Sequence, residues 1–64
     1  MNIREYIAAY SEQVVAIDMD KAVTVNTDST GKTQNTIISF SGLDGDYIEV
    51  VEPYKRVLEE WRND

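Results

Sequence analysis

The pattern of apolar and polar residues is clearest in the C-terminal third of the chain, and the rest of the predicted fold is organised around it. Residues 37–41 and 47–51 are rich in β-branched and aromatic side chains, which is typical of short strands. Asp44-Gly45 lies between them and suits a type I′ hairpin turn, because both residue types tolerate positive φ. In the second strand, Ile48 and Val50 are expected to face the core.

Residues 53–62 predict an amphipathic helix that follows these strands. Pro53 suits the first helical position, where a backbone N–H would have no partner. The apolar residues then recur with the i, i+3, i+4, i+7 spacing of one helix face: Tyr54, Val57, Leu58 and Trp61.

The middle of the chain predicts three more short elements. Residues 13–17 form a short β-branched run, and residues 21–26 place Val23 and Val25 on one side of a half-buried strand. Residues 28–32 combine the turn formers Asp, Ser and Gly and predict a hairpin loop. The chain is then expected to return as a strand over 36–40, with Ile38 and Phe40 in the core.

The first ten residues allow two interpretations. Asn2 stands three positions before Glu5, as in a capping box, and Ile3, Tyr6, Ile7 and Tyr10 have helical spacing, so a helix over about Ile3 to Tyr10 is favoured. A strand competes, because Tyr6, Ala8 and Tyr10 also alternate.

Together these elements predict one α+β domain over residues 1–64. Its centre is a small, twisted antiparallel β-meander of about four strands, with the C-terminal amphipathic helix packed on one face. The N-terminal segment, as a short helix or an extra strand, closes an edge or an end of the sheet.

The order of elements over about residues 14–61 resembles a known group of small proteins. Ile17-Asp18-Met19-Asp20 forms a bend after the first short strand, and Val50-Val51-Glu52-Pro53 leads into the helix. This pattern resembles the flagellar FlbD-like proteins and many small bacterial and phage proteins built in the same way. The resemblance implies a role in regulation or assembly rather than catalysis.

Composition limits how such a chain can be stabilised. In 64 residues there is room for one small core, with roughly 60% of the unfolded surface buried on folding. The chain has no Cys and no His, so disulfides and the usual zinc ligands are excluded. Self-association, as a homodimer, or a partner surface is the remaining source of stability.

Charge narrows the classes of partner. The net charge is −6, and the segment from Asp18 to Glu52 contains seven acids and two bases. An acidic surface repels phosphate backbones and anionic lipid, so direct nucleic-acid or membrane binding is not expected. Arg4 and Glu5 come too early for a signal peptide, and a cytoplasmic location in a bacterium or its phage is the default expectation.

Two patterns hint at ligand chemistry and have simpler explanations. Gly31-Lys32-Thr33 ends like a phosphate-binding loop, but the position of the first glycine is Asn26, so a hairpin loop is favoured. Carboxylates at 18, 20, 44 and 46 offer oxygen ligands for Ca²⁺ or Mg²⁺, but they lack the spacing of a calcium loop, and turns and solvated acids explain them. We expect no catalytic residue, cofactor or metal.

A protein partner is the function class that best fits these observations. We expect a non-catalytic interaction or regulatory module that acts through an acidic sheet face or an exposed sheet edge. The alternative is an acidic inhibitor that imitates DNA in the nucleic-acid site of a basic protein. The residues predicted to form the interaction surface are Asp18, Asp20, Asp44, Asp46, Glu49, Tyr6 and Tyr10.

Overall fold

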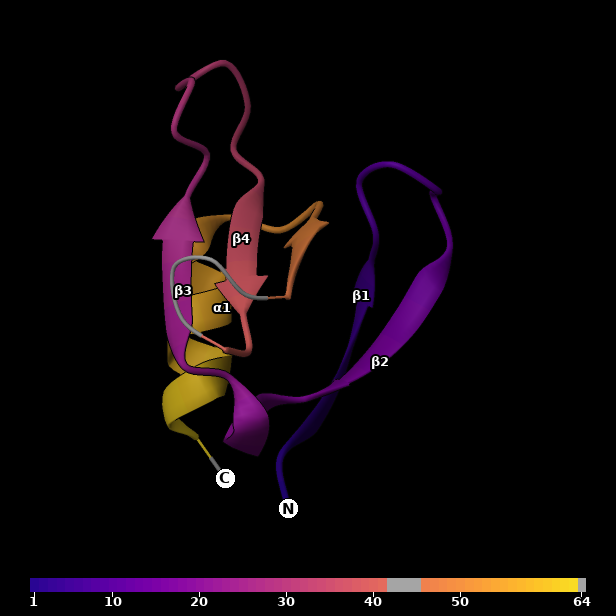
Figure 1. Ribbon diagram of the computed structural model, residues 1–64, viewed down its shortest axis with the longest axis vertical. Helices are drawn as coiled ribbons and strands as arrows, with labels where there is room; N and C mark the ends of the chain where they lie inside the picture. Colours follow the sequence, from indigo (N-terminus) through magenta and orange to yellow (C-terminus); the bar gives the residue numbers. More distant parts are fainter. Residues whose placement is uncertain (42–45, 64) are drawn as a thin grey trace.

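A computed structural model describes residues 1–41 and 46–63 of the chain (Figure 1). In chain order the elements are β1 (Ile3–Ile7), β2 (Val14–Asp18), the 3₁₀ helix η1 (Met19–Lys21), β3 (Thr24–Thr27), β4 (Thr36–Ser39), β5 (Tyr47–Val50) and α1 (Tyr54–Arg62). The predicted Asp44-Gly45 turn lies outside the described residues.

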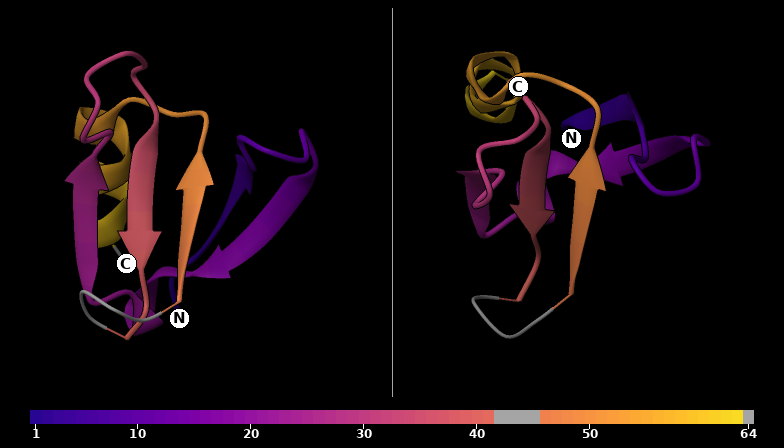
Figure 2. Two further views of the ribbon diagram at one scale, coloured as in Figure 1. Left: turned by 45° about the horizontal axis from the view of Figure 1, so that its top comes forward. Right: turned by 90° about the horizontal axis from the view of Figure 1, so that it is seen from above.

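The strands form two antiparallel sheets. β1 and β2 form a hairpin, and β3, β4 and β5 form a three-stranded sheet in sequence order. Helix α1 lies across one face of the three-stranded sheet, and the β1–β2 hairpin stands beside its β5 edge (Figures 1 and 2). The predicted α+β class with a C-terminal helix is confirmed. The prediction of about four strands in one meander is wrong in detail, because the strands divide between two sheets.

The N-terminal segment is a strand, so the favoured helix over Ile3 to Tyr10 is wrong. Both periodicities are present in the sequence, and long-range pairing decides between them. As a strand, the segment turns Tyr6 and Ala8 inward, where both are buried, and leaves Ile3 and Ile7 about half exposed. Antiparallel pairing with β2 then satisfies backbone groups that a helix would have satisfied internally.

A β-bridge joins the two sheets. Ala8 at the end of β1 pairs with Val50 at the end of β5. The Ala9 amide donates to the Glu49 carbonyl at 2.9 Å, and the Val51 amide donates to the Ile7 carbonyl at 2.8 Å. β1 therefore covers one end of the β5 edge and brings the hairpin against the larger sheet.

The core lies where hairpin, sheet and helix meet. Each element contributes one side chain, and the buried hydrophobic cluster consists of Tyr6, Ile17, Met19, Val25, Ile38, Val50 and Val57. Phe40, Ile48, Tyr54 and Trp61 pack against this cluster and stay partly exposed. The predicted apolar face of the helix and the inward positions of β4 and β5 are thereby confirmed.

Asn2 and Arg4 fasten the start of the chain to the end of α1. The Asn2 side-chain amide donates to the carbonyls of Glu60 at 2.8 Å and Trp61 at 3.4 Å, and Arg4 Nη2 donates to the Asn63 carbonyl at 3.0 Å. The last carbonyls of a helix have no hydrogen-bond donor within the helix, so Asn2 and Arg4 supply the missing donors. Asn2 thus caps the C-terminal end of α1 rather than starting a helix of its own.

Two further local predictions need correction. Pro53 occupies the N-cap position with an extended ψ of 146°, and the helix begins one residue later at Tyr54. Val23 lies beyond the first ladder pair of the sheet, Thr24 with Ser39, and this end position leaves its side chain about half exposed rather than in the core. Val25 is buried as predicted.

The size of the core makes it sensitive to a single lost methylene group. Ile38 is 0% exposed. We expect Ile38→Val to lower the free energy of unfolding by about 0.5–1.5 kcal/mol, because surrounding atoms cannot close the space fully. Urea denaturation measures this change. Ile7→Val makes the same chemical change at a side chain that is 46% exposed and should shift stability by less than ~0.5 kcal/mol; equal effects at both sites would contradict this core.

Candidate functional site

The face of the three-stranded sheet opposite α1 is left uncovered by the described elements (Figure 2). Side chains alternate between the two faces along each strand, so the residues that flank a core residue in the sequence point to the uncovered face. We call this surface the open sheet face; its strand residues are Thr24, Asn26, Ile37, Ser39, Tyr47 and Glu49. Together with Tyr10 and residues 27–30 they line a shallow hollow of about 680 Å³.

Two tyrosines stand on the open sheet face. Tyr10, from the β1–β2 turn, is 85% exposed, and Tyr47, at the start of β5, is 65% exposed. The Tyr10 hydroxyl donates to Glu49 Oε1 at 3.3 Å, and the negative charge of Glu49 raises the pKa of Tyr10. Both rings are largely exposed to solvent.

Glu49 links three segments on this face. Its second carboxylate oxygen, Oε2, accepts a hydrogen bond from Asn35 Nδ2 at 2.8 Å, so it joins the loop before β4 to the β1–β2 turn through Tyr10. Glu49 is only partly exposed. This predicted surface residue therefore orients its neighbours as well as contributing charge.

Asp28 organises the rim of the open sheet face. Its carboxylate accepts hydrogen bonds from the Thr30 amide at 2.9 Å, the Thr30 hydroxyl at 2.8 Å and the Thr33 hydroxyl at 2.7 Å. The Thr30 amide is the largest of the influences that lower the pKa of Asp28. The predicted hairpin loop is confirmed here, and the acid is used for turn structure.

Among the described residues, the other acids of the predicted surface do not line the hollow that Glu49 lines. Asp18 caps η1 by accepting from the Asp20 amide at 3.1 Å. Asp20 accepts from the Asn2 amide at 3.1 Å and lies 3.7 Å from the N-terminal ammonium group. Asp46 leads into β5, where its carbonyl accepts from the Phe40 amide at 2.9 Å. Asp44 lies outside the described residues.

Tyr6, predicted as a surface residue, is buried in the core at 3% exposure. Its hydroxyl donates to Glu60 Oε1 at 2.9 Å, which joins β1 to α1. Burial, reinforced by this hydrogen bond and the Glu60 charge, raises the pKa of Tyr6 far above its usual range. Tyr6 therefore stabilises the fold and is not available to a partner.

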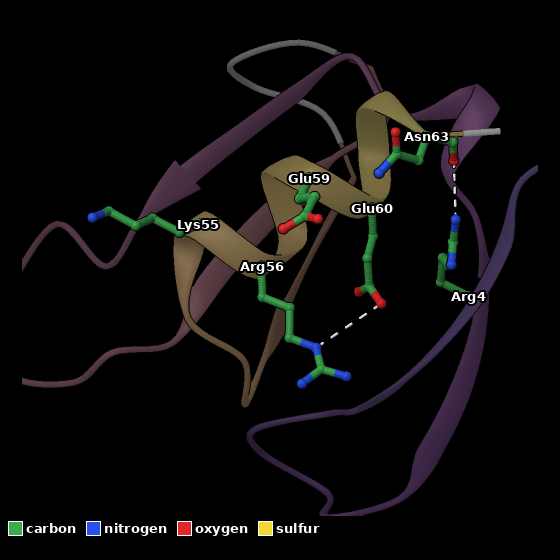
Figure 3. Close-up of a pocket in the computed structure, with 6 residues that line it drawn as sticks. All are labelled: Arg4, Lys55, Arg56, Glu59, Glu60 and Asn63. Carbon is green, nitrogen blue, oxygen red and sulfur yellow. Dashed lines mark hydrogen bonds and ion pairs between the residues drawn. The ribbon is translucent and has the colours of Figure 1, made fainter.

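A second hollow, between α1 and β1, carries mixed charge (Figure 3). It has a volume of about 580 Å³ and is lined by Arg4, Lys55, Arg56, Glu59, Glu60 and Asn63. Arg56 lies 4.0 Å from Glu60 and 3.7 Å from Glu52, Arg4 is occupied with the helix end, and Lys55 points away from the group. These exposed pairs balance one another and contribute little to stability.

The open sheet face includes residues that the sequence did not single out. Tyr47 and Ile37 stand next to the core residues Ile48 and Ile38, so alternation alone places them on the opposite side. The alternation that groups Tyr47 with Ile37 can be read from the sequence. Which face of the sheet α1 covers cannot, because it depends on tertiary packing.

Comparison with known proteins gives no further information on the function of this chain. No protein-family model matches the chain, and no curated protein or solved structure matches it significantly. The resemblance to the flagellar FlbD-like proteins stays a prediction. Within residues 1–41 and 46–63, no group of three or more acidic side chains is placed to hold a metal, and no helix there is long and apolar enough to cross a membrane.

The Tyr6–Glu60 contact makes stability sensitive to alkaline pH. A raised pKa means that the folded state retains the Tyr6 proton after the unfolded chain has released it, so stability is present below about pH 10 and is lost as pH rises further. Tyr6→Phe removes the hydroxyl and should lower the free energy of unfolding at pH 7 by about 1–2 kcal/mol while flattening this alkaline loss. Urea denaturation across pH 7–11 measures both effects.

Tyr10→Phe is the matched control for this measurement, because Tyr10 also bonds a glutamate but is exposed. Glu49 also raises the pKa of Tyr10, but water screens this exposed contact, so Tyr10→Phe should flatten the alkaline loss of stability much less than Tyr6→Phe does. An alkaline loss of stability that flattens equally in both variants would contradict the assignment of this loss to the buried Tyr6 hydroxyl.

Proposed function

We propose that this chain is a non-catalytic protein–protein interaction module that binds its partner through the open sheet face. The observation that carries the proposal is the pair of exposed tyrosines, Tyr10 and Tyr47, beside the partly buried Ile37. Tyrosine is enriched at binding hot spots, because it offers a large apolar ring with a polar tip at low entropic cost.

The surroundings of the tyrosines suggest the chemistry of the partner. Hydroxyl and amide groups of Thr24, Asn26 and Ser39 lie across the sheet, and the carboxylates of Asp28 and Glu49 stand at its rim. The two tyrosines stand on the β5 side of the open sheet face, and the polar groups extend from there across β4 and β3. Aromatic contact area beside polar and acidic groups is a usual composition of a protein interface. We therefore infer a partner that offers an apolar contact to the tyrosines and hydrogen-bond donors or basic groups beside it.

A second candidate function is the acidic inhibitor that occupies the nucleic-acid site of a basic protein. The net charge of −6 and the acidic majority between Asp18 and Glu52 favour it. Ionic strength separates the two candidates. Binding that depends on many charges weakens steeply with salt, whereas binding centred on aromatic contacts does not.

The test is an affinity capture from bacterial lysate with the tagged chain, washed in parallel at low and high salt, with retained proteins identified by mass spectrometry. A specific partner should survive high salt, and Tyr47→Ser and Tyr10→Ser should each weaken its binding by roughly tenfold or more. Circular dichroism verifies that both variants fold.

Val14→Ser is the matched control, because Val14 is 66% exposed, close to Tyr47, but lies on the β1–β2 hairpin. It should leave capture unchanged. A partner that is lost with Val14→Ser and retained with Tyr47→Ser would contradict the proposed surface. A basic nucleic-acid-binding protein held only at low salt would favour the inhibitor instead.

A further inference from the structure

The outer edge of β2 carries unpaired backbone groups. Backbone bonds from the Met19 amide to the Asn2 carbonyl and from the Ala8 amide to the Gln13 carbonyl, both 2.8 Å, fix the hydrogen-bonding phase of the hairpin. In an antiparallel ladder this phase alternates, so Val15 and Ile17 bond to β1 while Val14, Ala16 and Asp18 direct their N–H and C=O groups away from it. Among the described residues, the backbone hydrogen bonds between elements include none to Val14 or Ala16. Asp18 is the N-cap of η1, where its carbonyl accepts the first bond of that helix, so Asp18 offers this edge only its N–H group.

An apolar hollow of about 350 Å³ lies beside this edge. Its lining comes from β2, the end of η1, the residue after β4 and β5: Val15, Ala16, Ile17, Asp18, Lys21, Phe40 and Ile48. Phe40 and Ile48 belong to the margin of the core and are only partly buried. The β2 strand and the partly exposed margin of the core thus both line this hollow.

We propose that a second copy of this chain pairs its own β2 with this edge, antiparallel about a two-fold axis at Ala16. In this register Ala16 faces its counterpart and Val14 faces Asp18 of the second copy, and all of these residues have outward backbone groups. The edge is therefore complementary to itself. This surface is separate from the open sheet face, so the inference stands independently of the proposed function.

Charge and side-chain chemistry agree with this register. Residues 14–17 carry no charge and no proline, so two of the usual protections against edge pairing are absent from this part of β2. The two Asp18 carboxylates fall at opposite ends of the paired strands, about 13 Å apart for four residues of strand, and each faces a valine. Pairing also brings the two apolar hollows together, which adds burial to a chain with a small core.

The test uses the two-fold axis itself. Ala16 is exposed, so Ala16→Lys and Ala16→Glu should both fold. In the dimer each change places like charges directly opposite each other, which disfavours pairing. Sedimentation velocity over a concentration series should show a dimer for the wild-type chain and, for each variant alone, a dissociation constant raised at least ~10-fold. An equimolar mixture of the two variants should recover the dimer, because Lys then faces Glu.

Asn26→Lys is the matched control, because Asn26 is an exposed position on β3, at the other edge of the three-stranded sheet. It should remain as dimeric as wild type. A wild-type chain that stays monomeric throughout the series would overturn the proposal. So would a dimer that Ala16→Lys leaves intact, or one that Ala16→Lys and Asn26→Lys weaken equally.

Discussion

The two backbone hydrogen bonds that join the end of β1 to the end of β5 are the constraint on which the rest of this structure depends. A two-stranded hairpin is marginal on its own in water, and a three-stranded sheet with one short helix has little to bury. The bridge at Ala8 and Val50 lets the hairpin contribute Tyr6 and Ile17 to the same core as Ile38. One shared core is what a chain of 64 residues can support.

The way the hairpin, sheet and helix pack around this core determines which surfaces stay exposed. Helix α1 is held over one face of the three-stranded sheet, at its far end by Asn2 and Arg4, so the opposite face is left to Tyr10 and Tyr47. β1 covers one end of the β5 edge, and within the described residues β2 and β3 each have an outer edge without a strand partner. The two surfaces proposed to bind partners, the open sheet face and the outer edge of β2, are thus surfaces that the internal packing leaves exposed.

The sequence predicts the local elements well and their assembly less well. The β-branched runs in β2, β4 and β5 and the stripe ending at Trp61 need no long-range information, and their elements are present as predicted. Residues 3–10 fit both helix and strand, and their spacing favours the helix; the backbone partners that decide for a strand, such as Met19 and Val51, lie far along the chain. Of the predicted surface, Tyr10 and Glu49 lie together and Tyr6 is buried, because its neighbours in space could not be read from spacing.

Amide hydrogen exchange at Ala9 and Val51, followed by NMR, tests most directly whether the hairpin and the sheet share one core. Their N–H groups donate across the bridge, so they should exchange as slowly as the amides of the β3–β4 ladder, which open only when the core opens. Exchange as fast as in the exposed loop of residues 29–34 would contradict this account. In that case the hairpin would open independently of the sheet, and neither proposed surface would have a fixed geometry.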